Sequence, residues 1–398
     1  MDVPDLSPQS SFWDSAENAV LLNPRHQDEA PALGSELRDS LGREGIKGHV
    51  VFATSGSSGD AKFACLSKSA LLESASMVNH HLRAGDEDTW LCALPVFHVG
   101  GFGICARAHL ANGKLRVIES PWDAQAFADS AEEIGATMSS LVPTQVFDLV
   151  KARVVCPKNL RAVVVGGGAL DTDLRSQALA LGWPILESFG MTEAGSQIAT
   201  RDLESMRSIS LRLPILPGWS VRQNDDGLLE IRGRGLFSAY LVRGDDQEFE
   251  WNQPFDDDGW FGTSDRVALT EVDGNSWIEP MGRHDLVVKI RGENVDVARV
   301  QRDIDPTERL IVVVAVPDSR TGFRLVGVVE SGSRNVASAT SRLVRHHAVA
   351  APCEKVSLWA EVDSVPRSGL GKPLRLKLME KVQKYKNLIQ STRPSKSC

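Results

Sequence analysis

The chain has 398 residues, and its 44 Lys and Arg against 52 Asp and Glu give a formal net charge of −8 at pH 7. A hydrophobic fraction of 42% with 24% charged residues is ordinary for folded domains and excludes a disordered or collagen-like chain. The acidic balance argues against nucleic-acid binding, and no apolar run approaches the roughly 20 residues of a membrane span. The N-terminus lacks the basic and apolar regions of a secretory signal, so we expect a cytoplasmic protein without membrane insertion.

From residue 47 onward, short β-rich runs alternate with amphipathic helical segments. Strands are predicted at 49–54, 89–95, 114–119, 137–142, 161–165 and 184–189. Helices are predicted to begin after Ser67 and Asp123 and near Asp171, because Ser and Asp are favourable N-caps. The alternation predicts an α/β fold with a mainly parallel, helix-covered sheet, whose ligand site lies in the loops after the strands' carboxyl ends.

After residue 210 the pattern changes to shorter strands with turn signals at 225–227, 256–259 and 273–274, which predicts a small β-rich subdomain over about 210–282. A separate α+β unit follows. Its strands are expected near 286–290, 310–316 and 324–330, and its helices near 296–303 and 336–347.

A loop directly after the strand at 49–54 is rich in glycines and hydroxyls. It contains Thr54, Ser55, Gly56, Ser57, Ser58, Gly59 and Lys62. Glycines let backbone N–H groups approach an oligophosphate, hydroxyls donate to its oxygens and lysine adds positive charge. The spacing is not that of Walker A, and a flexible linker is the alternative, but the position after an apolar strand favours phosphate binding.

Two more strands end in polar or glycine-rich turns. The strand at 161–165 runs into Gly166–Leu170, which is either a ligand loop or a tight packing turn. The strand at 184–189 runs into Thr192 and Glu193, which offer a hydroxyl for phosphate and a carboxylate for Mg²⁺, or simply begin a helix. Further on, Asp265 is either a bidentate acceptor for ribose hydroxyls or a turn cap.

The order of these segments resembles one known superfamily. TSGSSGDAK, LPVFH, VPTQ, VVVGGGAL, ESFGMTE, DDGWFGTSD, GRHD, KIRGEN and PRSGLGKPLR follow one another as in the adenylate-forming acyl- and aryl-CoA synthetases, over residues 47–382. Within it, LPVFHVGGFGI and SLVPTQVFDLV look most like the o-succinylbenzoate–CoA ligases of menaquinone biosynthesis. The resemblance implies an ATP- and acid-binding domain at 1–282, a hinge at 283–285 and a mobile C-terminal domain at 286–398.

The resemblance also assigns roles to residues. The loop at 54–62 would hold the β- and γ-phosphates of ATP, and the nucleotide would also contact Gly167, Gly168, Ala169, Ser188, Phe189 and Gly190. Thr192 would contact the α-phosphate and Glu193 would ligate Mg²⁺, while Asp265 and Arg283 would hold the ribose. Asp285 would be the hinge residue, and Lys372 the lysine that reaches the reacting carboxylate.

The acid pocket is expected to involve His98, Arg107, Ser140, Thr144, Gln145 and Gly168. A histidine after a strand end is otherwise structural, and an arginine on a helix is otherwise solvent-exposed. If Arg107 faces the pocket, it would bind the second carboxylate that o-succinylbenzoate keeps after its first is activated.

The sequence therefore predicts an AMP-forming acid–CoA ligase that uses ATP, Mg²⁺ and coenzyme A. The alternatives are another aryl- or fatty-acid–CoA ligase, an adenylating enzyme that loads a carrier protein, and a degenerate nucleotide-binding protein.

The chain departs from the usual pattern of the superfamily in its N-terminal region. Only about fifty residues precede the phosphate loop, whereas relatives usually have over a hundred there; either the N-terminal lobe is pared down, or a partner or homo-oligomer covers the exposed sheet edge.

Overall fold

The structure is a computed structural model. It describes residues 3–23, 30–54, 62–244, 248–272, 274–290, 293–318, 321–331, 336–356, 358–369, 371–384 and 389–391. The chain divides into two compact units, and each is considered by itself. The first runs to Pro280, and the second begins at Met281 and also includes Ser264–Arg266.

The centre of the first unit is a six-stranded sheet in the order β5-β4-β6-β7-β8-β9. Its strands are β4 (Thr89–Cys92), β5 (Lys114–Val117), β6 (Met138–Leu141), β7 (Ala162–Val165), β8 (Ile185–Met191) and β9 (Ser196–Thr200). The first five in this order are parallel, and β9 pairs antiparallel with β8. The prediction of a mainly parallel sheet is therefore confirmed.

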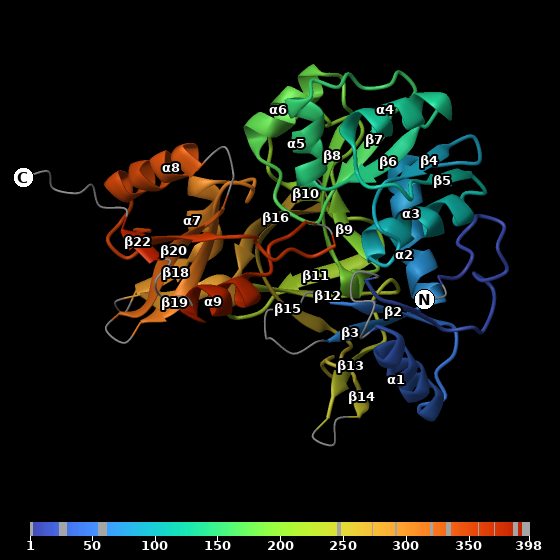
Figure 1. The fold of residues 1–398 in the computed structure, drawn as a ribbon. Helices are drawn as coiled ribbons and strands as arrows, with labels where there is room; N and C mark the ends of the chain where they lie inside the picture. The colour runs from blue at the N-terminus through green and yellow to red at the C-terminus, as the bar shows by residue number, and fades with distance from the viewer. Residues whose placement is uncertain are drawn as a thin grey trace, which may run out of the picture. The chain divides into compact units, whose positions relative to one another are not determined.

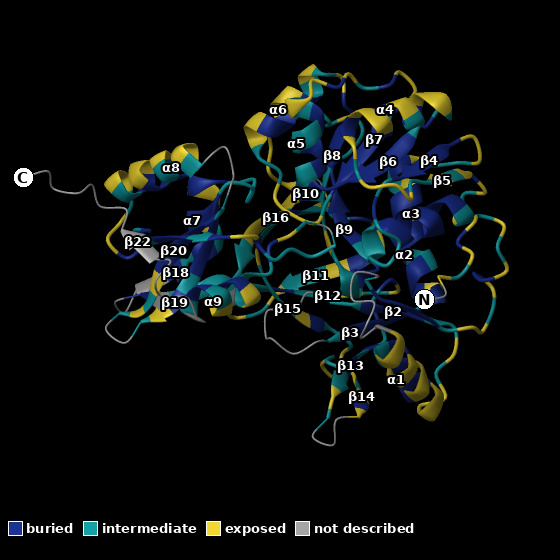
Figure 2. Ribbon diagram, in the orientation of Figure 1, coloured by how far each residue is buried: buried dark blue, intermediate teal, exposed yellow. Residues whose placement is uncertain are grey.

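Helices cover both faces of this sheet (Figure 1). They are α2 (Lys68–Leu82), α3 (Val99–Leu110), α4 (Ala124–Glu133), α5 (Pro143–Lys151) and α6 (Thr172–Ala180). Helices α4 to α6 pack on one face around Phe127, Leu149 and Trp183, while α3 packs on β4 and β6 from the other face. Figure 2 shows the buried strands between these layers. The predicted caps are present, since Ser67 and Asp123 accept hydrogen bonds from the N–H groups of Ala70 and Ala126.

A second, mixed sheet has the order β1-β2-β3-β13-β14, with α1 (Ala30–Arg43) against it. Its strands are β1 (Ala19–Leu21), β2 (His49–Ala53), β3 (Phe63–Ser67), β13 (Ala239–Arg243) and β14 (Phe249–Asn252). Strands β2 and β3 form the hairpin that carries the predicted phosphate loop. Strand β13 joins this hairpin from about 170 residues further along the chain, with Tyr240 opposite Ala64.

The predicted β-rich subdomain contains a third sheet with the order β10-β16-β15-β12-β11. The strands are β10 (Leu213–Pro214), β11 (Trp219–Gln223), β12 (Leu228–Gly233), β15 (Phe261–Val272) and β16 (Asn275–Arg283). Short 3₁₀ helices, η2 (Thr192–Ala194) and η3 (His284–Leu286), follow β8 and β16.

The second unit is an α+β domain built on a sheet in the order β18-β17-β20-β21-β22, with β19 also paired to β20. Its elements are β17 (Val287–Ile290), β18 (Glu293–Asp296), α7 (Val297–Ile304), β19 (Val312–Asp318), β20 (Gly322–Glu330), α8 (Val336–Val349), β21 (Leu358–Val362), α9 (Arg375–Lys384) and β22 (Ile389–Ser391). Alternate residues of β19 enter two cores: Val313 packs with α7 and α8, and Val312 and Val314 pack with α9. None of the helices in the described ranges combines the length and apolarity needed to cross a membrane.

Residues 3–23 pack on α2 and α3. Phe12 and Trp13 are 4% and 2% exposed, and both rings contact Phe102 of α3. Lys68 donates from its buried ammonium group to the carbonyl oxygens of Phe12 and Ser15, at 2.5 and 3.1 Å. Burying two aromatic side chains stabilises this arrangement by roughly 1.5–3 kcal/mol each. This segment therefore covers part of the surface of α2 and α3.

Candidate active site

The predicted phosphate loop begins and ends on the β2–β3 hairpin. Both the backbone N–H and the Oγ1 hydroxyl of Thr54 donate to the carbonyl oxygen of Lys62, each at 2.9 Å. The Lys62 ammonium lies 5.8 Å from the ring centroid of Tyr240, within the range of a cation–π contact. The predicted residues Ser55, Gly56, Ser57, Ser58 and Gly59 lie outside the described part of the chain.

The glycine turn after β7 and the end of β8 lie side by side. Gly167 has a φ of +78°, and a Cβ atom on Gly166 would lie 2.8 Å from Ser188 Oγ. Gly168 lies against Pro143 at the start of α5, because a Cβ atom added to Gly168 would lie 3.7 Å from the proline Cγ. Gly167, Gly168 and Ala169 are exposed, and Ser188 and Phe189 are half-buried. These predicted nucleotide residues therefore meet at the carboxyl ends of neighbouring parallel strands.

Glu193 is held by the chain around β13. Its Oε1 accepts a hydrogen bond from the Tyr240 hydroxyl at 2.5 Å, and its carbonyl oxygen accepts one from Phe237 N at 2.8 Å. Both Thr192 and Glu193 are half-buried in η2. A side chain on the exposed Gly190 would collide with the carbonyl oxygen of Ser196, so glycine is required for the close approach of β8 and β9.

His98 precedes α3, but its imidazole does not cap the helix. The Nε2 atom is buried and has no hydrogen-bond partner among the described residues. Burial lowers the pKa of His98 to about 4, so the ring is neutral at physiological pH. A neutral, unpartnered imidazole nitrogen at the end of a strand is available to a ligand.

Arg107 is 1% exposed, which contradicts the alternative of a solvent-facing helical arginine. Its Nε donates to the carbonyl oxygen of Gly103 at 2.8 Å, and its guanidinium carbon lies 5.1 Å from the centroid of the Trp90 ring. The NH1 nitrogen is buried and unpartnered, and no carboxylate in the described ranges forms an ion pair with it. Burial lowers the pKa of Arg107 to about 10, which still leaves it charged.

Ser140 is also buried, and its hydroxyl has no partner among the described atoms. It lies opposite Cys92 across the β4–β6 pair, and the Cys92 thiol donates to Gly101 O in α3 at 3.7 Å. Thr144 is half-buried and follows Pro143 in the first turn of α5. Gln145, in contrast, uses its side chain structurally, since Oε1 accepts from Val142 N and Nε2 donates to Ala93 O.

Two residues of this region were not predicted. Ser196, at the start of β9, lies against Gly103 of α3. A Cβ atom added to Gly103 would lie 3.6 Å from Ser196 Cβ and 3.3 Å from Arg107 NH2. Tyr240 contacts both Lys62 and Glu193. Neither contact follows from local spacing, because each joins segments far apart in the chain.

In the second unit, Asp265 and Arg283 face each other. The Arg283 NH1 and Asp265 Oδ2 atoms are 3.8 Å apart, and their side chains are 39% and 17% exposed. Asp285 lies in η3, directly after this pair. The two residues expected to hold the ribose are therefore neighbours in space.

Lys372 lies in a tight turn before α9, and it is exposed. Ser368 N donates to Lys372 O at 2.8 Å, and Lys372 N donates to Ser368 Oγ at 3.2 Å. Arg367 stabilises the turn, since its NH1 donates to Gly371 O at 3.0 Å and its NH2 to Glu308 O at 2.6 Å. The lysine thus projects from a fixed turn rather than from a helix.

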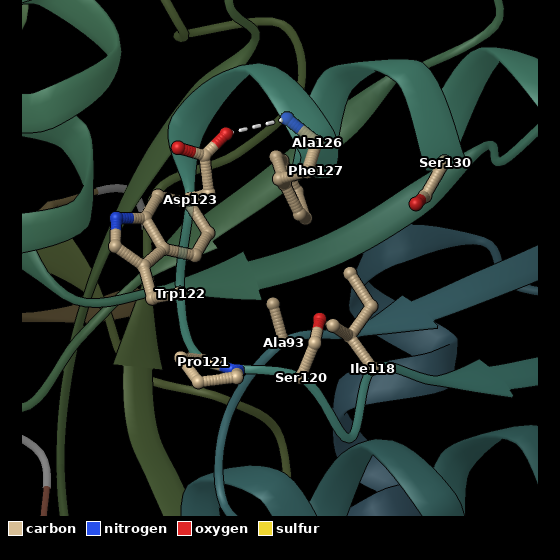
Figure 3. A pocket seen from close by; sticks show the side chains of 9 residues that line it. All are labelled: Ala93, Ile118, Ser120, Pro121, Trp122, Asp123, Ala126, Phe127 and Ser130. Carbon is tan, nitrogen blue, oxygen red and sulfur yellow. Dashed lines mark hydrogen bonds between the residues drawn. The ribbon is translucent and has the colours of Figure 1, made fainter.

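A small hollow beside α4 is distinct from this region (Figure 3). Its lining consists of Ala93, Ile118, Ser120, Pro121, Trp122, Asp123, Ala126, Phe127 and Ser130. It encloses about 30 Å³, which accommodates a few waters but not a nucleotide or an aromatic acid. No predicted site residue lines it.

Comparison with known proteins confirms the resemblance. Residues 49–241 match the family model of the AMP-binding enzymes. The 2-succinylbenzoate–CoA ligase of Escherichia coli K12 is 30% identical over 285 residues, covering 71% of this chain and 58% of that protein. The probable 2-succinylbenzoate–CoA ligase of Mycobacterium tuberculosis H37Rv is 28% identical over 378 residues, covering 91% of this chain and 90% of that protein. The chain thus spans less than two thirds of the E. coli relative.

Solved structures show the same fold. A variant of E. coli MenE with bound OSB-AMS matches with a TM-score of 0.67 and 26% identity, over 84% of this chain and 69% of that one. The Bacillus subtilis o-succinylbenzoate–CoA synthetase in complex with OSB-AMP matches with a TM-score of 0.69 at 22% identity, over 83% and 68%. The chain therefore has the α/β fold of adenylate-forming enzymes.

Proposed function

We propose that this chain is an ATP-dependent acid–CoA ligase whose acid carries a second carboxylate, with o-succinylbenzoate as the best candidate. One observation carries the choice of acid: the three buried polar atoms Arg107 NH1, Ser140 Oγ and His98 Nε2 have no partner among the described residues. Unpaired buried polar groups are costly in the free protein, so the lack of protein partners for these atoms favours a polar ligand. A buried arginine favours an anion, which a fatty acid or benzoate no longer offers once its only carboxylate reacts.

In the proposed reaction, an oxygen of one carboxylate attacks the α-phosphorus of ATP. The bond between the α-phosphorus and its bridging oxygen to the β-phosphate breaks, so acyl-AMP forms and pyrophosphate leaves. The CoA thiolate then attacks the acyl carbonyl carbon and AMP leaves with the electron pair of the acyl–oxygen bond. Because two anions must approach in the first step, positive charge at their junction dominates the barrier, and we assign this role to Lys372.

A Mg²⁺ ion fits the residues present. Mg²⁺ is usually held by one or two carboxylates together with substrate phosphates, rather than by an all-protein cage. Glu193 supplies one carboxylate, and the described residues contain no cluster of three His, Cys, Asp or Glu. The bound ion would neutralise phosphate charge as it develops on the leaving group. Thr192 would donate to the α-phosphate, and the loop at 54–62 would hold the β- and γ-phosphates.

Asp265 and Arg283 would bind the ribose, and we keep Asp285 as the hinge between the two half-reactions. The resemblance supports these roles, and so does the position of 283–285 just after the division between the two units at Pro280 and Met281. Two half-reactions at one site require two arrangements of the C-terminal domain, so the rotation concentrates in a few residues.

The test is a pyrophosphate-release assay over a panel of acids, with and without CoA. We expect o-succinylbenzoate to be activated and converted to its CoA thioester. Replacing Arg107 with Met should lower kcat/KM for this acid by about 10- to 150-fold, the effect of losing a charge-assisted hydrogen bond of about 1.5–3 kcal/mol. Arg116→Met is the matched control, because Arg116 is exposed and forms an ion pair with the exposed Glu133.

Two outcomes would contradict this proposal. Activation of a monocarboxylic acid in preference to o-succinylbenzoate would leave the adenylation chemistry intact but overturn the choice of acid. Pyrophosphate release that is followed by acyl transfer to a carrier protein but not to CoA would identify the alternative acceptor.

Lys372→Ala tests the assigned catalytic lysine. We expect loss of acyl-AMP formation, while thioester formation from supplied acyl-AMP is largely retained, because the lysine neutralises charge only during attack on phosphate. Lys377→Ala, which changes an exposed lysine of the following helix, should leave both half-reactions unchanged. Equal loss of both half-reactions in Lys372→Ala would contradict the role.

A further inference from the structure

We propose that Tyr240 is a positioning residue that sets the orientation of Glu193 toward Mg²⁺ and links it to the lysine of the phosphate loop; this inference rests on the proposed function. Tyr240 lies in β13, in a different sheet from β8, which leads into Glu193. Its hydroxyl donates to Glu193 Oε1 at 2.5 Å, the short distance of a hydrogen bond to a charged acceptor.

Glu193 is fixed at two points by one segment. Phe237 N donates to the Glu193 carbonyl oxygen at 2.8 Å, three residues before Tyr240 binds the carboxylate. The backbone and the side chain of Glu193 therefore have the same support. Because the phenol engages Oε1, it selects one rotamer of a flexible side chain, and Oε2 makes no hydrogen bond to the residues that the structure describes.

The same ring contacts the end of the phosphate loop. The Lys62 ammonium lies 5.8 Å from the Tyr240 centroid, and the residue opposite Tyr240 on β3 is Ala64. Lys62 and Glu193 are 131 positions apart in the chain, yet each contacts Tyr240. One side chain therefore orients both a cation for phosphate and a carboxylate for the metal.

The two contacts use different parts of the tyrosine and can be separated by mutation. Tyr240→Phe removes the hydroxyl and keeps the ring beside Lys62. Tyr240→Leu removes both. A matched structural control is Ser40→Ala, because the buried Ser40 hydroxyl donates to Phe249 O in β14, the strand paired with β13, at 2.9 Å. It weakens the same sheet without contacting Glu193.

The experiment measures ATP affinity by calorimetry, with Mg²⁺ and with EDTA, in the absence of any acid. We expect Tyr240→Phe to weaken ATP binding by about 10-fold with Mg²⁺ and by less than about 2-fold without it, since the lost hydrogen bond is charge-assisted and acts only through the metal ligand. Tyr240→Leu should weaken ATP binding further than Tyr240→Phe does, and this additional loss of affinity should remain without Mg²⁺. Ser40→Ala should lower the melting temperature and leave both affinities unchanged.

A double-mutant cycle distinguishes an effect that acts through Glu193 from a general defect of folding. If Tyr240 acts through Glu193, the Tyr240→Phe effect should disappear in a Glu193→Gln background. Equal weakening with and without Mg²⁺, or an unchanged effect in that background, would overturn the inference while leaving the proposed function standing. If wild-type protein binds no ATP with Mg²⁺, the proposed function fails and this inference fails with it.

Discussion

Two buried arginine sites in the first unit differ in what balances their charge. Arg175 and Arg201 are 7% and 3% exposed, and each places its Nε 2.6 Å from an oxygen of Glu187. Arg201 also donates to Ser210 O at 2.5 Å. Arg107 is equally buried, yet it contacts the Gly103 carbonyl and the Trp90 ring and lies near the Cys92 and Cys105 thiols. No carboxylate in the described part of the chain forms an ion pair with it.

The difference separates structural charges from functional ones. A buried charge with a carboxylate and carbonyl partners is part of the folded framework, and breaking such a pair is strongly destabilising. A buried charge without a counter-ion lowers stability in the free protein and gains its partner only when an anion binds. Burial is the same at both sites, so the presence or absence of a carboxylate partner, and not burial, distinguishes Arg107, the arginine that we propose binds the acid.

The largest expected effect is at the paired site. Glu187→Leu leaves Arg175 and Arg201 buried close together without a counter-ion, so we expect a loss of about 3–5 kcal/mol in the free energy of unfolding, measured with urea. Glu133→Leu removes the partner of the exposed Arg116 and should cost less than about 1 kcal/mol. Similar losses in the two variants would contradict the distinction between the sites.

Arg107→Met should behave in the opposite way. Without ligand, we expect an unchanged or slightly higher free energy of unfolding, because a buried unpaired charge is replaced by an apolar side chain. o-Succinylbenzoate at 100 times its Kd should stabilise the wild type by about 2.7 kcal/mol, and at the same concentration it should stabilise the variant much less. A large loss of stability in the unliganded variant would mean that Arg107 is structural.

His98 should add a pH dependence to stability. Its pKa in the folded protein is about 4, below the ordinary 6.5, because of burial. Between these values the unfolded chain binds the proton and the folded protein does not, so stability falls as the pH decreases from about 6.5 to 4 and is flat above. We expect a change of about 2 kcal/mol over this range from urea titrations.

The control for this titration is a second histidine. His98→Asn should remove most of the slope, whereas His80→Asn, at an exposed position of α2, should retain it. A slope that persists in His98→Asn would show that another group titrates in this range.

The smallest effect is expected at a third buried cationic site, that of Lys68, whose hydrogen-bond acceptors are neutral. Lys68→Met removes hydrogen bonds to the carbonyl oxygens of Phe12 and Ser15. We expect a loss of about 1 kcal/mol and faster proteolysis within residues 3–23, because these acceptors lose their donor. Lys114→Met, which changes an exposed lysine, should leave the cleavage rate unchanged. Cleavage at the wild-type rate in Lys68→Met would contradict this anchoring role.

Sequence reasoning was most accurate where the determinants are local. Ser67 and Asp123 were predicted as N-caps and accept the expected backbone hydrogen bonds. The apolar runs at 161–165 and 184–189 correspond to β7 and β8, and their side-by-side pairing follows from the βαβ pattern. Caps and periodicity depend on a few neighbouring residues, which is why they are readable without the fold.

The candidate site residues also divide into those that local sequence indicates and those that only the fold brings together. His98 and Glu193 follow predicted strand ends, and parallel strands bring such residues to one edge of a sheet. Ser140 lies within β6 and was proposed from the family resemblance of its segment. Ser196 and Tyr240 were missed because no motif position identifies them: their importance lies in contacts with Arg107 and Glu193 across different sheets. The structural use of the Gln145 amide was missed for the same reason.

The sequence by itself determined the α/β class and the order of the elements, because these depend on composition and short-range spacing. It also supplied the groups that we propose bind phosphate and the acid. Only the tertiary structure decided which charges have partners. Arg107 and Arg201 look alike in sequence, and nothing local indicates that one meets Glu187 while the other meets a glycine carbonyl and a tryptophan ring. Whether a buried charge is balanced depends on atoms contributed by distant segments, and folding alone brings these together.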